Sequence, residues 1–176
     1  MRSVQNGNSS GMETLFRMYR DGTGVEQCDS EALKWLEKAA ETSQHDKKNN
    51  SCPISELGEC HEFGLLGLQP DPDEAFKYYH EAAKHNYSPG RYNLGRCFLL
   101  GIGTEKNLYK AIDWLQKASE CEDFDDHIYQ ERAMRLLAEI YRTGEYAEVN
   151  EEKANEWLKK ADEVKKQSES LKKGTK

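Results

Sequence analysis

The chain has 176 residues, enough for one domain with a sizeable hydrophobic core that needs no disulfides or metals to support it. Hydrophobic residues make up 36% and charged residues 32%, a balance that favours amphipathic helices with narrow apolar faces over a β-sandwich. The formal net charge is −7, and the chain without its Lys-rich segment 159–176 carries −11; because such a surface repels phosphate, we expect no nucleic-acid binding.

The sequence predicts no membrane-spanning or secretory segment. No apolar run approaches the length of about 18 residues that a membrane-spanning helix requires. Residues 1–11 are polar and lack the hydrophobic stretch of a secretory signal. The five cysteines are odd in number and irregularly spaced, which is typical of reduced thiols. The sequence therefore predicts a cytoplasmic protein with no membrane span and with five free thiols.

Four markers recur in a fixed order and define a repeat of about 36 residues, with longer linkers after the first and third units. Each unit has a leucine, a glycine seven residues later, and then two alanines seven residues apart with an aromatic three residues after the first. The leading leucines are Leu15, Leu57, Leu94 and Leu137. The glycines are Gly22, Gly64, Gly101 and Gly144. The first alanines are Ala32, Ala75, Ala111 and Ala154, and the aromatics are Trp35, Tyr78, Trp114 and Trp157.

Each unit predicts two helices. In the first helix, the leucine and a ring-bearing residue four positions later share one face, and the glycine at the seventh position ends the helix. In the second helix, the two alanines and the aromatic between them form one stripe, which predicts that the aromatics are largely buried. The residue after each leading leucine is glycine or alanine in three units, so neighbouring helices are expected to approach closely there.

The first unit, residues 12–42, departs from the others at two positions. Cys28 stands where the later units have Asp or Asn as a helix cap, so Asp29 or Ser30 is expected to cap the second helix instead. Phe16 follows the leading leucine, either because a terminal unit has no preceding neighbour or because it meets a repeat outside this sequence. Residues 1–11 are predicted to be disordered.

The later units span residues 53–86, 89–121 and 128–162. Their second helices are predicted to begin after the caps Asp71, Asn107 and Asn150. Residues 163–176 are expected to form a polar, Lys-rich helix end or tail.

The third unit carries a family resemblance. Its motifs are Tyr92-Asn93-Leu94-Gly95, Phe98, Gly101-Ile102-Gly103, Lys110-Ala111 and Trp114-Leu115-Gln116-Lys117-Ala118. They resemble Sel1-like repeats, a relative of tetratricopeptide repeats. The resemblance covers residues 12–162 and implies an all-α, right-handed α/α superhelical solenoid of four helix pairs. It also implies a non-catalytic adaptor or scaffold that binds proteins.

No catalytic, cofactor or metal site is predicted. His80 and His85 are five residues apart, which puts them about 140° apart around a helix, so they do not share a metal ion. Cys60 and Cys97 occupy a core position of the repeat and are expected to behave as small hydrophobic residues. Some Sel1-like proteins are secreted, with cysteines paired inside each repeat; that pairing is absent here, so a hydrolase of this type is the least favoured alternative.

Binding of a protein or peptide is predicted on the concave surface, which the first helix of each pair lines. Side chains near positions −2, +2 and +5 from the leading leucine point away from the core stripe. The candidate partner-binding residues are Arg17, Arg20, Glu59, Glu62, Tyr92, Arg96, Leu99, Glu139 and Arg142.

The mixed charges of this set favour a peptide or helical segment as the ligand of a monomeric chain. Tyr92, Arg96 and Leu99 are expected to be exposed and to form a binding hot spot, and replacing Tyr92 and Arg96 is expected to leave folding intact. The alternative function is a docking or regulatory region of a larger enzyme or signalling complex.

Overall fold

The computed structural model describes residues 9–43, 53–120, 127–145 and 147–174. Within these ranges the chain forms eight α-helices and no strand, which confirms the all-α class. The helices are α1 (Ser9–Asp21), α2 (Asp29–Ser43), α3 (Pro53–Phe63), α4 (Pro72–Lys84), α5 (Ser88–Leu100), α6 (Leu108–Ser119), α7 (His127–Thr143) and α8 (Glu151–Gly174).

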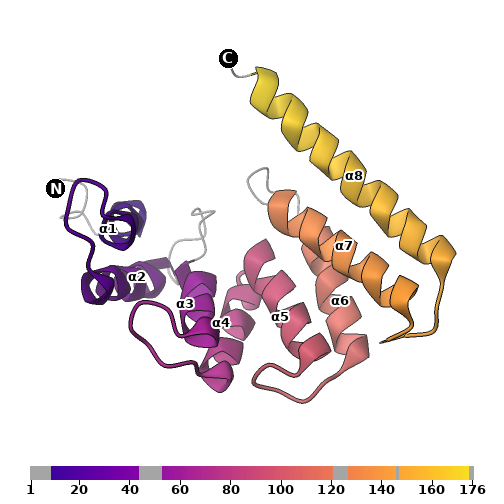
Figure 1. Cartoon of the computed structure of the whole chain (residues 1–176), viewed down its shortest axis with the longest axis horizontal. Helices are drawn as coiled ribbons and strands as arrows, with labels where there is room; N and C mark the ends of the chain where they lie inside the picture. The colour runs from indigo at the N-terminus through magenta and orange to yellow at the C-terminus, as the bar shows by residue number, and fades with distance from the viewer. Residues whose placement is uncertain (1–8, 44–52, 121–126, 146, 175–176) are drawn as a thin grey trace.

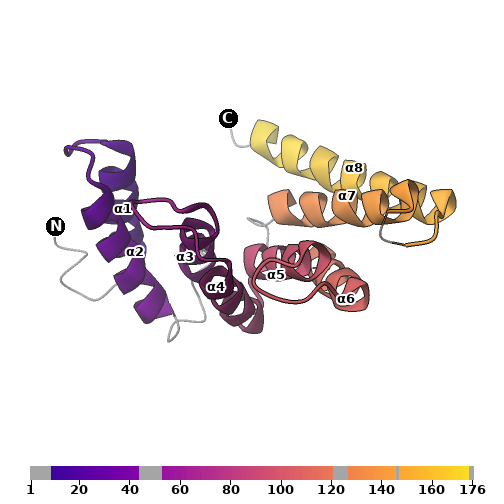
Figure 2. The same cartoon turned by 60° about the horizontal axis from the view of Figure 1, so that its bottom comes forward.

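The eight helices pack as four pairs, α1 with α2, α3 with α4, α5 with α6 and α7 with α8. Each pair stacks on the next through α2 and α3, α4 and α5, and α6 and α7, so that the pairs follow one another along an arc (Figures 1 and 2). The chain is therefore a solenoid, in which each unit buries its apolar stripe against its own partner helix and its neighbours. No helix in the described part of the chain is long and apolar enough to cross a membrane.

Helix starts and ends follow local side-chain chemistry. The side chains of Asp71, Asn107 and Asn150 each accept a hydrogen bond from the backbone N–H three residues later, at 3.0, 3.0 and 2.9 Å, as predicted. The four glycines that end the first helices all have φ between 65° and 79°, in the left-handed region that glycine tolerates. The repeat pattern thus fixes where most helices begin and end.

The cap of α2 corrects a prediction. Cys28 itself holds the cap position, because its carbonyl accepts a bond of 2.9 Å from the N–H of Ala32 and its sulfur accepts one from the backbone of Glu31. Neither Asp29 nor Ser30 takes this role, since α2 already includes both. The Ser30 hydroxyl lies 3.3 Å from the sulfur.

The four aromatics are partly buried and pack against the core, but none of the four is a fully buried core residue; the four are Trp35, Tyr78, Trp114 and Trp157. The next residue is the core residue in three units, where Leu36, Tyr79 and Leu115 have no exposed surface. The outer faces of the tryptophan rings are instead covered by a lysine three residues later, with ammonium-to-ring-centre distances of 4.2–4.7 Å.

The small residues after the leading leucines allow the close approach that the sequence predicts. A Cβ added at Gly58 would lie 2.6 Å from Cε1 of Tyr79, and one at Gly95 would lie 2.8 Å from Cγ of Leu115. Both contacts are with the fully buried residue of the partner helix. In the first unit Phe16 is 2% exposed and packs in a cluster with Ile54 and other residues of the following pair.

The first helix begins earlier than predicted, whereas the C-terminal segment forms the helix end that the sequence allowed. Residues 9–11, expected to be disordered, form the first turn of α1, and residues 1–8 lie outside the described residues. At the other end α8 continues to Gly174.

Candidate functional site

A network of polar side chains joins α3 to α5. The guanidinium of Arg96 donates to both carboxylate oxygens of Glu62, at 2.9 and 3.2 Å, and to Oδ1 of Asn93 at 3.1 Å. The hydroxyl of Tyr79 donates to the same carboxylate at 2.7 Å. The side chain of Glu62 is only 8% exposed and that of Arg96 20%, so this ion pair is screened from water far better than a surface pair.

The network continues toward α7. The Asn93 amide donates to Glu59 at 3.3 Å and to the hydroxyl of Ser55 at 3.4 Å, and Asn93 itself is 2% exposed. The hydroxyl of Tyr129 donates to Glu59 at 3.5 Å. The ring of Tyr129 packs edge-on against that of Tyr92, with 5.7 Å between ring centres.

We call the non-core side chains of α1, α3, α5 and α7 the first-helix surface.

The structure divides the predicted site residues among three places. Glu59, Glu62, Tyr92 and Arg96 belong to the network just described. Arg17 and Arg20 are exposed on α1, where Arg20 forms an ion pair of 2.8 Å with Asp21. Glu139 and Arg142 are exposed on α7 and border a separate cavity of about 340 Å³ next to Leu158 of α8.

Leu99 corrects the prediction that it is exposed. It is 4% exposed and belongs to the main hydrophobic core, because α5 packs against α3, α4, α6 and α7, so that even its fifth position after the leading leucine faces a neighbour. The side chain of Glu62 is likewise buried and does not lie on the exposed part of the first-helix surface. The exposed leucine at this end of α5 is Leu100, at 44%.

Four residues of the network are not among the predicted site residues: Ser55, Tyr79, Asn93 and Tyr129. Asn93 directly precedes a leading leucine, and a polar residue at that position could have indicated a buried hydrogen bond. The repeat pattern did not point to Tyr129, because this residue lies in the N-terminal extension that makes α7 longer than the other first helices.

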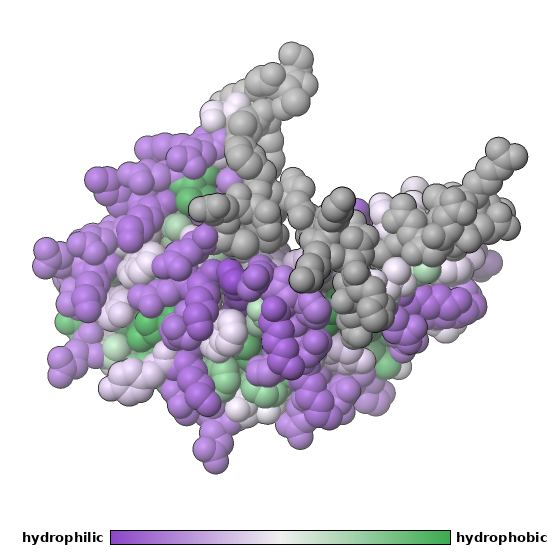
Figure 3. Space-filling model, turned by 180° about the vertical axis from the view of Figure 1, so that it is seen from behind, coloured by the Kyte–Doolittle hydropathy of each residue, from purple (hydrophilic) through white to green (hydrophobic). Residues whose placement is uncertain are grey.

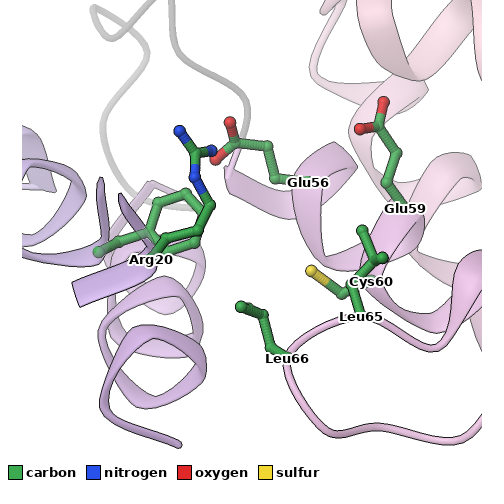
Figure 4. A pocket seen from close by; sticks show the side chains of 7 residues that line it. Arg20, Glu56, Glu59, Cys60, Leu65 and Leu66 are labelled. Atoms are coloured by element: carbon green, nitrogen blue, oxygen red, sulfur yellow. The ribbon is translucent and has the colours of Figure 1, made fainter. Parts of the chain in front are cut away.

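A cavity of about 280 Å³ lies between α1 and α3 (Figure 4). Its apolar wall consists of Phe16, Cys60, Leu65 and Leu66. Its charged residues are Arg20, Glu56 and Glu59; the Arg20 and Glu56 side chains extend toward each other at one edge, whereas the Cys60 thiol lies deeper (Figure 4).

The electrostatics of this cavity are those of a partly dehydrated acidic site. Burial raises the pKa of Glu56, and the arginines Arg17 and Arg20 partly oppose this effect. Burial also raises the pKa of Cys60 to about 11, with the charges of Glu56 and Glu59 adding to it. An added positive charge nearby would therefore stabilise the ionised carboxylate of Glu56.

The face opposite to that of Figure 1 is mostly hydrophilic (Figure 3). Its hydrophobic residues form small separate patches among charged side chains, as expected for an ordinary protein surface.

Within the described ranges, no group of three or more His, Cys, Asp or Glu residues is placed to hold a metal ion. Cys28, Cys60 and Cys97 are free thiols, whereas Cys52, Cys121 and most of the acidic linker 120–126 lie outside the described residues.

The free thiols are expected to react at very different rates in the folded protein. A hydrogen bond from the Ser30 hydroxyl lowers the pKa of Cys28, whereas burial raises the pKa of Cys60 to about 11 and that of Cys97 to about 12. Since only the thiolate is nucleophilic, iodoacetamide at pH 8 should label Cys28 first.

Peptide mapping by mass spectrometry after timed labelling measures these rates. Cys60 and Cys97 should become reactive only after denaturation. Native labelling of Cys97 as fast as that of Cys28 would contradict the burial described above.

Comparison with known proteins places the fold among described families. The sequence model of the Sel1 repeat matches residues 11–41, 54–87, 88–123 and 131–161. The crystal structure of a Sel1 repeat protein from Oxalobacter formigenes superposes with a TM-score of 0.73 at 23% identity, over 89% of this chain and 57% of that one.

Two fungal relatives have names that describe regulatory proteins. Chitin synthase regulatory factor 2 of Schizosaccharomyces pombe is 28% identical over 149 residues, which cover 81% of this chain and 27% of that protein. Activator of C kinase protein 1 of Saccharomyces cerevisiae is 33% identical over 112 residues, covering 58% of this chain and 17% of that protein. The chain thus matches about a quarter or less of the length of these relatives.

Proposed function

The chain belongs to the Sel1 repeat family, and from this premise we propose that it is a non-catalytic scaffold that binds a protein or peptide segment on its first-helix surface. Four repeats over residues 12–162 form the binding unit, and residues 163–174 extend its last helix. We place the protein in the cytoplasm as a monomer.

One observation carries the proposal: the first-helix surface presents charges of both signs beside a cavity with an apolar wall. Arg17 and Arg142 are exposed at the two ends of this surface, and Glu59 and Tyr92 lie between them, half-buried. Such a combination suits an extended or helical segment that makes polar contacts along its length. Leu99 and Glu62 are left out of the proposed contact residues because both are buried.

Reversing charges on this surface should remove the partner. We expect the double variant Arg17→Glu/Arg142→Glu to lose proteins that the unchanged chain captures from cells that express it, because both arginines are exposed and lie on different repeats. Lys106→Glu, in the exposed loop before α6, is the matched control and should retain them. The measurement is affinity capture with quantitative mass spectrometry. Equal recovery by all three proteins would place binding elsewhere.

A second candidate is a regulatory or docking region of a larger enzyme or signalling complex. The names of the two fungal relatives, a regulatory factor and an activator, favour it, as does the small part of their length that this chain matches. The discriminating measurement is the rate of a captured enzyme with and without added chain. A change in that rate supports regulation, and an unchanged rate supports simple scaffolding.

A further inference from the structure

We propose that the cavity between α1 and α3 is an anchoring pocket for one large apolar side chain of a partner segment, and that this segment carries a lysine or arginine beside the anchor. The inference rests on the proposed function and assigns the partner's chemistry at one point of the first-helix surface.

The pocket exists because the stack of first helices is open at this point. α3 contacts α5, and α5 contacts α7, whereas α1 and α3 make fewer contacts with each other. The space left between them is the cavity of about 280 Å³. This volume lies just below the range of about 300–1,000 Å³ that is typical of sites for whole small molecules, and it suits a single side chain.

The wall of the pocket is apolar and reaches the surface. Phe16 and Cys60 are 2% and 5% exposed and form its buried part, whereas Leu65 is 47% exposed at its mouth. The neighbouring Phe63, at the end of α3, is 55% exposed. An apolar side chain that enters this space would cover surface that otherwise contacts water, which is how anchor residues contribute most of the binding energy at protein interfaces.

The acidic residues around the pocket favour a basic residue beside the apolar anchor in the partner segment. Glu56 and Glu59 border the cavity, and Glu13 lies close enough to raise the pKa of Glu56. The arginine that borders the cavity, Arg20, already donates to both carboxylate oxygens of Asp21, at 2.8 and 3.1 Å.

The carboxylates of Asp21, Glu56 and Glu59 therefore outnumber the two nearby arginines, Arg17 and Arg20, within a chain whose net charge is −7. Charge complementarity thus favours a partner segment with a lysine or arginine next to its apolar anchor.

Selection of random 12-residue peptides displayed on phage, with the full chain immobilised, tests this chemistry directly. Enriched peptides should share a Leu, Ile, Met or Phe with a Lys or Arg within three positions. One selected peptide is then synthesised and titrated by fluorescence anisotropy against variants of the chain. Circular dichroism checks that each variant retains the helical content of the unchanged chain.

Two pairs of variants separate the anchor from the charge. Leu65→Ser should weaken peptide binding tenfold or more, whereas Val149→Ser, at another exposed aliphatic residue (60%) in the loop before α8, should change it less than twofold. Glu56→Gln should weaken binding and flatten its salt dependence, whereas Glu156→Gln on α8, outside the first-helix surface, should do neither. Leu65 is exposed and outside the core, so its replacement leaves folding intact.

Each other outcome overturns the inference. Peptides that bind Leu65→Ser unchanged but lose affinity for Arg17→Glu/Arg142→Glu would refute the pocket and leave the proposed function standing. Peptides insensitive to every variant of the first-helix surface, or no enrichment at all, would refute both. Concentration-dependent dimerisation in sedimentation equilibrium that Leu65→Ser abolishes would make a second copy of this chain the occupant.

Discussion

Replacing Leu115 with alanine is expected to lower the free energy of unfolding by about 3 kcal/mol, the middle of the range for fully buried leucines. Leu115 has no exposed surface, and it packs directly under Gly95 of α5 in the main core. Because a Cβ at Gly95 would already be too close to it, the two helices are in tight contact here, and the deletion leaves a cavity between them. Urea denaturation followed by far-ultraviolet circular dichroism measures the loss.

The preceding residue provides the matched comparison. Trp114 is half-buried, with Lys117 lying 4.4 Å above its ring, and Trp114→Ala should cost less, about 2 kcal/mol. Tyr109→Ala, at a residue that is 88% exposed, should cost less than about 0.5 kcal/mol. A larger loss for Trp114→Ala than for Leu115→Ala would mean that the aromatic, and not its neighbour, fills the core.

Arg96→Ala is expected to cost about 3 kcal/mol, because it leaves the carboxylate of Glu62, 8% exposed, without its cation. This corrects the expectation that Arg96 can be replaced without loss of stability. In the double variant Arg96→Ala/Glu62→Gln the uncompensated charge is gone, and much of the stability should return. The hydroxyl of Tyr79 can still donate to the new amide.

Arg135 is the control for this experiment. It also contacts two carboxylates, those of Glu131 at 2.8 Å and Asp162 at 3.0 Å, but its side chain is 42% exposed. Arg135→Ala should therefore cost less than about 1 kcal/mol. Thermal and urea unfolding of the four proteins give the comparison, and equal losses for Arg96→Ala and Arg135→Ala would show that burial does not strengthen the pair with Glu62.

The repeat, the eight helices of the described residues and most of their ends can be predicted from the order of the amino acids alone. These features depend on chemistry within one helical turn or at one backbone position: the caps Asp71, Asn107 and Asn150 bond three residues ahead, and the glycines that end the first helices need only a permitted φ. A pattern that acts over so few residues is visible along the chain, and repetition in four units makes it unambiguous.

Only the tertiary structure decided which residue of a shared face enters the core and which charges meet. Positions three and four after the first alanine lie about 100° apart on one stripe, and the approach of the partner helix buries Leu115 fully and leaves Trp114 half-buried. Glu62 and Arg96 are 34 residues apart, and α5 is covered on so many sides that Leu99 is buried. The cavity beside Phe16 likewise depends on how far α1 stands from α3, a distance that no periodicity within either helix encodes.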